Sequence, residues 1–228
     1  MRRKFAVFDI DGTVFRSSLL TELVTALIEE NIFPERAQTE YAREYRDWLN
    51  RSGTYERYIN AVIKTFMKHL KGVHYGDFAR VGEVVIAENQ LHTYTYTRDL
   101  ITSLKRDGYY LVAISQSPKT VLDKFCKHLG FDKVYGRFYE LGPSDRFTGE
   151  VGDEHLIANK ANIVRRVIEK EGLTFEDSVG VGDTEGDISM LELVERPICF
   201  NPNKELYQVA RVQGWPVVVE RKDVVYEL

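Results

Sequence analysis

The sequence contains little cysteine, and the cysteines it has are not placed to bind a metal. Cys126 and Cys199 are far apart and form no C-x-x-C pair. The five histidines also show no pairing that suggests a metal site or a catalytic triad. This pattern favours a reduced, cytoplasmic protein and gives no basis for a zinc site.

Long apolar runs and an excess of positive charge are absent too. No stretch approaches the roughly 20 apolar residues of a membrane span, and the apolar residues that follow Met1-Arg2-Arg3-Lys4 are too few for a signal peptide. With Lys and Arg totalling 31 against 35 Asp and Glu, the net charge of −4 gives no electrostatic case for binding nucleic acid or an anionic membrane. We expect a small-molecule partner, and no heptad or repeat indicates an oligomeric state.

The chain does have enough apolar sequence for a sizeable core, in two different patterns. It is 43% hydrophobic over 228 residues, a length that fits one or two domains. From about residue 18 to 90 the apolar residues recur at helical spacing, whereas after about residue 94 helix and strand patterns alternate. This order predicts an α/β fold: a Rossmann-like parallel sheet core over residues 1–16 and 92–228, interrupted by a helical cap over 17–91.

The alternating part of the chain predicts individual elements. Strands are expected at 5–8, 109–114, 134–135, 178–181, 197–200 and 216–219, a hairpin at 138–151, and helices at 97–107, 157–171 and 204–212. Ser117 and Pro118 are expected to open the helix after the second strand, as its N-cap and first-turn proline. Asp187 is a candidate N-cap for a short helix over 188–193.

Carboxylates follow two of these apolar strands. Asp9 and Asp11 end the first strand, and Asp183 and Asp187 follow the strand at 178–181. Because parallel strands place their carboxyl ends at one edge of the sheet, the four acids are expected in one crevice. Clustered acids need a divalent cation, and a set of hard oxygen ligands favours Mg²⁺.

Other residues at the same edge are suited to bind a phosphate. Lys160 lies in the helix before the strand at 178–181 and supplies a positive charge for a phosphoryl oxygen. Thr13 and Ser115 can donate hydroxyl hydrogen bonds, and the amides around Ser115, Gln116 and Ser117 form an anion-receptive helix start.

These motifs, in this order, resemble those of the haloacid dehalogenase superfamily of phosphohydrolases. The four motifs are Asp9-Ile10-Asp11-Gly12-Thr13, Ser115 after an apolar strand, Lys160, and Gly182-Asp183-Thr184-Glu185-Gly186-Asp187. The helical insertion between the first two motifs also resembles the small caps of that superfamily. Three further segments resemble its phosphoserine-phosphatase-like subgroup, subfamily IB: Ser115-Gln116-Ser117-Pro118, Phe147-Thr148-Gly149-Glu150 and Asp187-Ile188-Ser189-Met190-Leu191.

The resemblance implies a catalytic or metal-binding role for each acid. Asp9 is implied to attack phosphorus and form an aspartyl-phosphate, and Asp11 to act as general acid and then general base. Mg²⁺ is implied to be bound by the Asp9 carboxylate, the Asp11 backbone carbonyl and Asp183, with Asp187 as a ligand or a partner of the ligands. The implied activity is a Mg²⁺-dependent phosphatase acting on a small-molecule phosphate monoester.

Two alternatives use the same residues. A phosphotransferase or phosphomutase would form the same intermediate but shield it from water, and a silent module would bind phosphate without turnover. The substrate is also open, because Ser18 stands where phosphoserine phosphatases typically carry a glutamate, and Gly12 where they often carry a serine.

The expected cap is dense in aromatic residues. They lie at 41, 45, 48, 55 and 58, and could bind a cationic group of a substrate. At helical spacing, however, aromatic residues more often form a core, which is the interpretation we favour.

Overall fold

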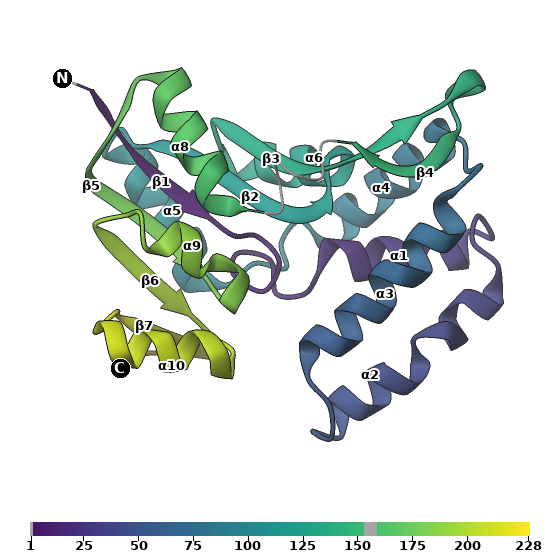
Figure 1. Cartoon of the computed structure of the whole chain (residues 1–228), viewed down its shortest axis with the longest axis horizontal. Coiled ribbons are helices and arrows are strands. Elements are labelled where there is room, and N and C mark those ends of the chain that lie inside the picture. The colour runs from purple at the N-terminus through teal and green to yellow at the C-terminus, as the bar shows by residue number, and fades with distance from the viewer. Residues whose placement is uncertain (1, 153–158) are drawn as a thin grey trace. The chain divides into compact units, whose positions relative to one another are not determined.

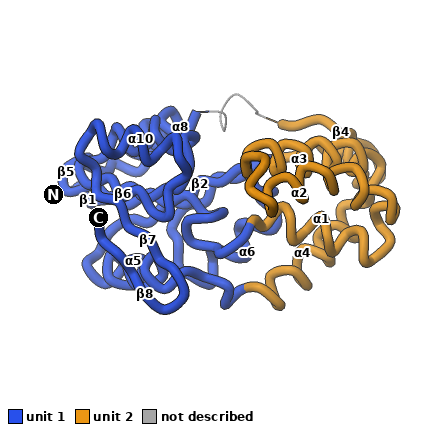
Figure 2. Tube along the Cα trace, turned by 90° about the horizontal axis from the view of Figure 1, so that it is seen from below, with its two compact units in different colours: residues 1–17, 90–137, 153–228 blue, residues 18–89, 138–152 orange. Residues whose placement is uncertain are grey.

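The computed structural model describes residues 2–152 and 159–228, which divide into two compact units. Unit 1 comprises 1–17, 90–137 and 153–228, and unit 2 comprises 18–89 and 138–152 (Figure 2). In the described part of the chain, no helix combines the length and the apolar character needed to cross a membrane.

Unit 1 is an α/β unit built on a mostly parallel sheet (Figure 1). Its elements are β1 (Arg3–Phe8), α5 (Thr95–Arg106), β2 (Tyr110–Pro118), α6 (Lys119–Leu129), the first half of β3 (Lys133–Leu141), α8 (Lys160–Glu171), β5 (Leu173–Gly182), η3 (Glu185–Asp187), α9 (Ile188–Leu191), β6 (Arg196–Phe200), α10 (Lys204–Gln213), β7 (Val217–Arg221) and β8 (Val224–Glu227). The strand order is β3-β2-β1-β5-β6-β7-β8, parallel except for β8. The predicted α/β fold with a parallel sheet is confirmed.

Helices cover both faces of this sheet, which explains the continuous apolar sequence of β1. Phe5 and Val7 belong to a core that includes residues of α8, α9 and α10. On the other face, the ring of Phe8 lies 5.8 Å from that of Phe131, which follows α6. Figure 2 shows α8 and α10 on one side of unit 1 and α5 on the other. A central strand buried on both faces carries charge only at its ends, and the carboxyl end of β1 leads into Asp9.

Unit 2 consists of helices and a β-hairpin. Its elements are α1 (Leu19–Glu29), η1 (Glu35–Glu40), α2 (Ala42–Leu49), α3 (Tyr55–Leu70), α4 (Tyr75–Asn89), the second half of β3, η2 (Pro143–Asp145) and β4 (Phe147–Gly152). The expected division assigned the hairpin to the sheet core, but the structure groups residues 138–152 with the helices. The reason is aromatic packing: the Phe147 ring lies 5.0 Å from Phe78, and Tyr139 lies 5.2 Å from Phe66.

The aromatic residues of α2 and α3 contact one another. The Trp48 and Tyr58 rings are stacked at 5.4 Å, and Tyr45 and Tyr55 pack against the same pair. Tyr41 and Tyr58 are buried, and burial raises the pKa of Tyr58 to about 12. These rings form the contact between the two helices.

One strand of unit 1 was not predicted, and one helix begins later than expected. The strand β8 was not predicted; it follows a turn in which Lys222 has a φ of 55°, and it pairs antiparallel with β7. Its residues are exposed, so it lacks the burial pattern that marks the other strands. The helix expected over 157–171 is α8, which begins at Lys160; residues 157 and 158 lie outside the described part of the chain.

Candidate active site

Three carboxylates meet where β1 and β5 end. Asp9 follows β1, and Asp183 and Asp187 follow β5, the neighbouring strand. Each of the three places a carboxylate oxygen within 4.8 Å of the others. Asp9 is 6% exposed and Asp187 is fully buried, so two of the three charges are largely withdrawn from water.

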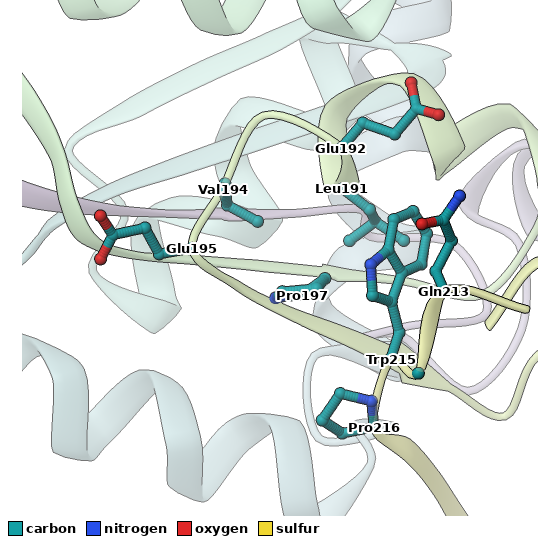
Figure 3. A pocket seen from close by; sticks show the side chains of 9 residues that line it. Leu191, Glu192, Val194, Glu195, Pro197, Gln213, Trp215 and Pro216 are labelled. Atoms are coloured by element: carbon teal, nitrogen blue, oxygen red, sulfur yellow. The ribbon is translucent and has the colours of Figure 1, made fainter. Parts of the chain in front are cut away.

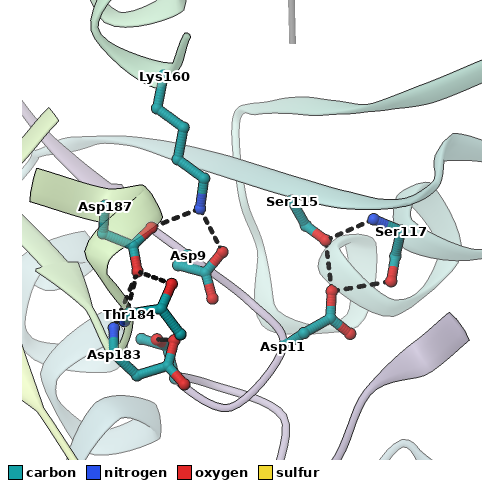
Figure 4. Close-up of polar contacts among 9 residues, drawn as sticks. Asp9, Asp11, Ser115, Ser117, Lys160, Asp183, Thr184 and Asp187 are labelled. Carbon is teal, nitrogen blue, oxygen red and sulfur yellow. Dashed lines mark hydrogen bonds and ion pairs between the residues drawn. The ribbon is translucent and has the colours of Figure 1, made fainter. Parts of the chain in front are cut away.

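Lys160 supplies a positive charge within this cluster (Figure 4). It is the first residue of α8, and its ammonium Nζ lies 2.5 Å from Asp9 Oδ1 and 2.5 Å from Asp187 Oδ1. The start of α8 is fixed by Asn159, whose side chain accepts a hydrogen bond from the backbone N–H of Asn162. Burial acts to lower the pKa of Lys160, but the two carboxylates outweigh it and raise the pKa, so the lysine stays charged.

One lysine does not balance three carboxylates. Burial raises the pKa of Asp9 to about 7, although Lys160 acts in the opposite direction, and Asp187 and Asp11 raise it further. Burial and the neighbouring Asp9 also raise the pKa of Asp183 well above its usual range. The cluster therefore favours an additional positive charge, because the single positive charge of Lys160, although it contacts both Asp9 and Asp187, offsets only one of the three carboxylate charges.

Asp187 is oriented by its own loop. Its Oδ2 accepts hydrogen bonds from the backbone N–H groups of Asp183 and Thr184, both at 3.0 Å, and closes a capping box at the start of η3. Asp187 is the N-cap residue of the following helix, as expected, but its side chain does not do the capping. Its side chain makes no cap hydrogen bond to α9, because both carboxylate oxygens are already used by this loop and by Lys160.

Two glycines let the acids approach the backbone. Gly12 has a φ of +83°, and a Cβ at this position would lie 2.2 Å from Asp183 Oδ2. A Cβ on Gly182 would lie 2.5 Å from the Asp187 side chain. At Gly12 two constraints act together, because a side chain would clash and the left-handed backbone is unfavourable for other residues.

We therefore expect Gly12→Ala to lower kcat/KM by about 100-fold, the effect of displacing a reactive group by about 1 Å. The matched control is Gly108→Ala, because Gly108 has a φ of +81° but nothing within 4 Å of the added Cβ. Both variants carry about 1–2 kcal/mol of backbone strain, so both melting temperatures should fall, that of Gly12→Ala further because of the clash, while only Gly12→Ala loses activity. Equal kcat/KM values for the two variants would contradict the role of the clash.

Asp11 faces two serines rather than the acid cluster. Its Oδ2 accepts hydrogen bonds from Ser115 Oγ at 2.5 Å and from Ser117 Oγ at 2.8 Å (Figure 4). The expectation that Ser117 and Pro118 open the next helix is wrong: β2 continues to Pro118, which is itself the N-cap position of α6. The extended backbone instead places the side chains of residues 115 and 117 on the same side of the strand, toward Asp11.

For the site, the sequence prediction used only the backbone amide of Ser117 and missed the role of its side chain. The available signal was its spacing of two from Ser115, because alternate residues of a strand share a face. The same alternation places Gln116 elsewhere: it is exposed, and its Oε1 accepts a hydrogen bond from Arg137 Nη2 at 2.7 Å. Thr13 does lie with the acids, donating from Oγ1 to Asp183 Oδ1 at 3.1 Å.

A separate cavity of about 390 Å³ lies at the opposite edge of the unit 1 sheet, where β6 and β7 begin (Figure 3). It is lined by Leu191, Glu192, Val194, Glu195, Pro197, Gln213, Gly214, Trp215 and Pro216. None of these is a residue of the acid cluster, so this cavity is distinct from the candidate active site.

A family model describing haloacid dehalogenase-like hydrolases matches residues 6–192. The chain belongs to this hydrolase family. The match spans the acids, the serines and Lys160 described above, and the chain is accordingly an enzyme of the phosphoric monoester hydrolase class.

Two relatives of this hydrolase are named as phosphatases. The chain is 26% identical over 223 residues to a histidinol-phosphatase of Neisseria meningitidis, covering 95% of this chain and 98% of that protein. It is 25% identical over 210 residues to a phosphoserine phosphatase of Archaeoglobus fulgidus, covering 91% of this chain and 55% of that protein. The fold is similar to a solved structure entitled a phospho-aspartyl intermediate analogue of phosphoserine phosphatase, with a TM-score of 0.64, 20% identity, and coverage of 98% of this chain and 96% of that one.

The donor set of this hydrolase fits a hard divalent cation. The three clustered side chains offer only carboxylate oxygens, the ligands that Mg²⁺ prefers. The cluster also has the charge imbalance that a dication would offset. Asp183 accepts a hydrogen bond from Thr13 and lies close to the backbone of Gly12.

Proposed function

We propose that this enzyme is a Mg²⁺-dependent phosphatase that hydrolyses a small-molecule phosphate monoester through an aspartyl-phosphate on Asp9. The observation that carries the proposal is the position of Asp9: a buried carboxylate directly after the central strand, 2.5 Å from a buried lysine and next to Asp183. This arrangement pairs a nucleophile with groups that compensate the charge of a phosphoryl group.

The Asp9 and Asp183 carboxylates and the Asp11 backbone carbonyl would hold the metal. Asp187 contributes by orienting Lys160, since one of its oxygens binds Nζ and the other binds backbone amides. When bound, Mg²⁺ supplies positive charge that stabilises the phosphoryl oxygens in the transition state.

In the first step, a carboxylate oxygen of Asp9 forms a bond to phosphorus, and the bond between phosphorus and the substrate oxygen breaks. Asp11 gives its proton to that departing oxygen, which leaves as an alcohol. Lys160 holds its charge beside Asp9 throughout, while the Thr13 hydroxyl donates to Asp183 and the Ser115 hydroxyl donates to Asp11.

In the second step, Asp11, now ionised, takes a proton from water. The resulting hydroxide bonds to phosphorus, the bond to Asp9 breaks, and inorganic phosphate is released. Asp9 returns to a carboxylate and Asp11 is again protonated, so the enzyme is regenerated.

The named relatives suggest where to look for the substrate. Histidinol phosphate and phosphoserine are both phosphate esters of amino alcohols, and two relatives are named for acting on them. We propose that the substrate is a small primary phosphate ester of this kind.

Phosphate release from a panel of esters tests the proposed function. The panel contains histidinol phosphate, phosphoserine, phosphocholine, sugar phosphates and nucleotides, and the readout is kcat/KM for free phosphate. We expect one primary ester to exceed the others by at least about tenfold, a difference of about 1.4 kcal/mol in transition-state binding. A phosphoryl transferase would instead show substrate loss in excess of free phosphate.

A further inference from the structure

The side chain of Asp11 is held by a hydrogen-bond network that centres on Ser117. Ser117 donates twice: its hydroxyl donates to Asp11 Oδ2 at 2.8 Å, and its backbone N–H donates to Ser115 Oγ at 2.9 Å. Because Ser115 Oγ accepts this amide hydrogen bond, its own proton is directed to Asp11 Oδ2, 2.5 Å away. Ser117 therefore acts on Asp11 directly and through Ser115.

Both serines of the network are buried and lie at the end of β2. Ser115 is fully buried and Ser117 is 3% exposed, so water does not compete readily for these hydroxyl groups. The pairing of β2 with β3 shifts register between Ile114 and Pro118. This irregularity lies at the end of β2 that carries both serines, where strands often re-aim side chains.

Both serine hydroxyl groups bind the same carboxylate oxygen of Asp11. Oδ2 is thus occupied by two donors, and Oδ1 takes no part in these two hydrogen bonds. A carboxyl group fixed through one oxygen presents the other in a constant direction.

We propose that Ser117 is a positioning residue, which aims Asp11 Oδ1 at the oxygen of the departing alcohol. The proposal rests on the proposed function, in which Asp11 protonates that oxygen. The hydrogen bonds of Ser117 run to Asp11 and Ser115, so its effect passes through Asp11.

The test compares leaving groups that differ in their need for a proton. The leaving group of an alkyl phosphate is a strongly basic alkoxide unless it is protonated. The leaving group of p-nitrophenyl phosphate is a stable phenolate, which needs little general acid catalysis. General acid catalysis contributes about 10²–10⁴-fold, and kcat/KM reports the first step, in which the leaving group departs, so Ser117→Ala should lower kcat/KM at least about tenfold more for the best alkyl ester than for p-nitrophenyl phosphate. Ser117→Thr keeps the hydroxyl and should retain the ratio of the wild type.

The matched control is Ser178→Ala. Ser178 is also a fully buried strand serine of unit 1, but its Oγ accepts from the backbone N–H of Glu195. This variant should leave the ratio of the two kcat/KM values unchanged, whatever it does to stability.

Two outcomes separate the inference from the proposed function. Equal losses for the two esters in Ser117→Ala would overturn the positioning role, because a purely structural defect does not distinguish leaving groups. Asp11→Asn should show the same selective loss in larger degree, whereas Asp9→Asn, which removes both activities together, tests the proposed function by itself.

Discussion

Asp9→Asn should lower kcat by on the order of 10⁴-fold or more for every phosphate ester, p-nitrophenyl phosphate included. An amide cannot attack phosphorus as a carboxylate does, and the loss is independent of the leaving group because the nucleophile is needed in each case. Asparagine keeps the size of the side chain and an oxygen able to accept from Lys160, which lies 2.5 Å from Asp9 Oδ1. Turnover is measured by phosphate release under saturating substrate.

Asp9→Asn should be at least as stable as the wild type at alkaline pH. In the metal-free protein, burial raises the pKa of Asp9 to about 7, above the ordinary value of 3.8. The stability that this group contributes is fully present below about pH 4 and is lost as the pH rises through 7, because the folded state then has to hold an unfavourable charge. Removing that charge should leave the melting temperature at pH 8 in EDTA equal to or above that of the wild type.

The control for this substitution is Asp177→Asn. Asp177 lies in β5, the strand next to β1, but its side chain is 49% exposed and pairs with Lys4. It should retain wild-type kcat. Substantial turnover by a folded Asp9→Asn protein would refute the nucleophilic mechanism.

Removal of divalent metal should lower kcat by about 100-fold or more, since metal stabilisation of the transferring phosphoryl group is worth several kcal/mol. Added Mg²⁺ should restore turnover. Binding should also raise the melting temperature: free Mg²⁺ at about 100 times its Kd contributes about 2.7 kcal/mol, or about 5–10 °C for a protein of this size. The measurements are phosphate release and thermal unfolding after EDTA treatment, with and without Mg²⁺.

The increase in melting temperature should be larger at pH 8 than at pH 5.5. Protons compete with Mg²⁺ for carboxylates whose pKa values are raised, as they are for Asp9 and Asp183. Asp183→Asn, which removes one ligand but leaves Lys160 paired, should lose most of the Mg²⁺-dependent stabilisation. Full turnover in the presence of EDTA would contradict the metal requirement.

Local sequence was sufficient to predict the elements that carry the candidate site. A run such as Phe5–Phe8 is apolar on both faces because it is a central strand, and the acids that follow it mark the strand's carboxyl end. Parallel strands place such ends at one edge, so the neighbourhood of Asp9, Asp183 and Lys160 was predictable before any contact was known. The exposed strand β8 could not be predicted in this way, because it lacks a burial pattern.

The roles of individual side chains depended on contacts between residues far apart in the chain. Asp187 looks like a helix cap in the sequence, but the buried Lys160, which is 27 positions away, and its own loop use both of its oxygens. Ser117 looks like a helix start, but Asp11, 106 positions away, binds its hydroxyl. Capping preferences describe what a side chain does when it has no stronger partner, and a buried charge is a stronger partner.

The sequence by itself determined the family, the parallel sheet and the residue types at its carboxyl edge, because these follow from apolar periodicity and from which residues end each strand. Only the tertiary structure decided that Gly12 must be a glycine for Asp183 to approach, that one lysine serves two carboxylates, and that two serines hold Asp11. The physical reason is that burial and close approach set charge balance and hydrogen bonding, and these arise only when distant strands pack together.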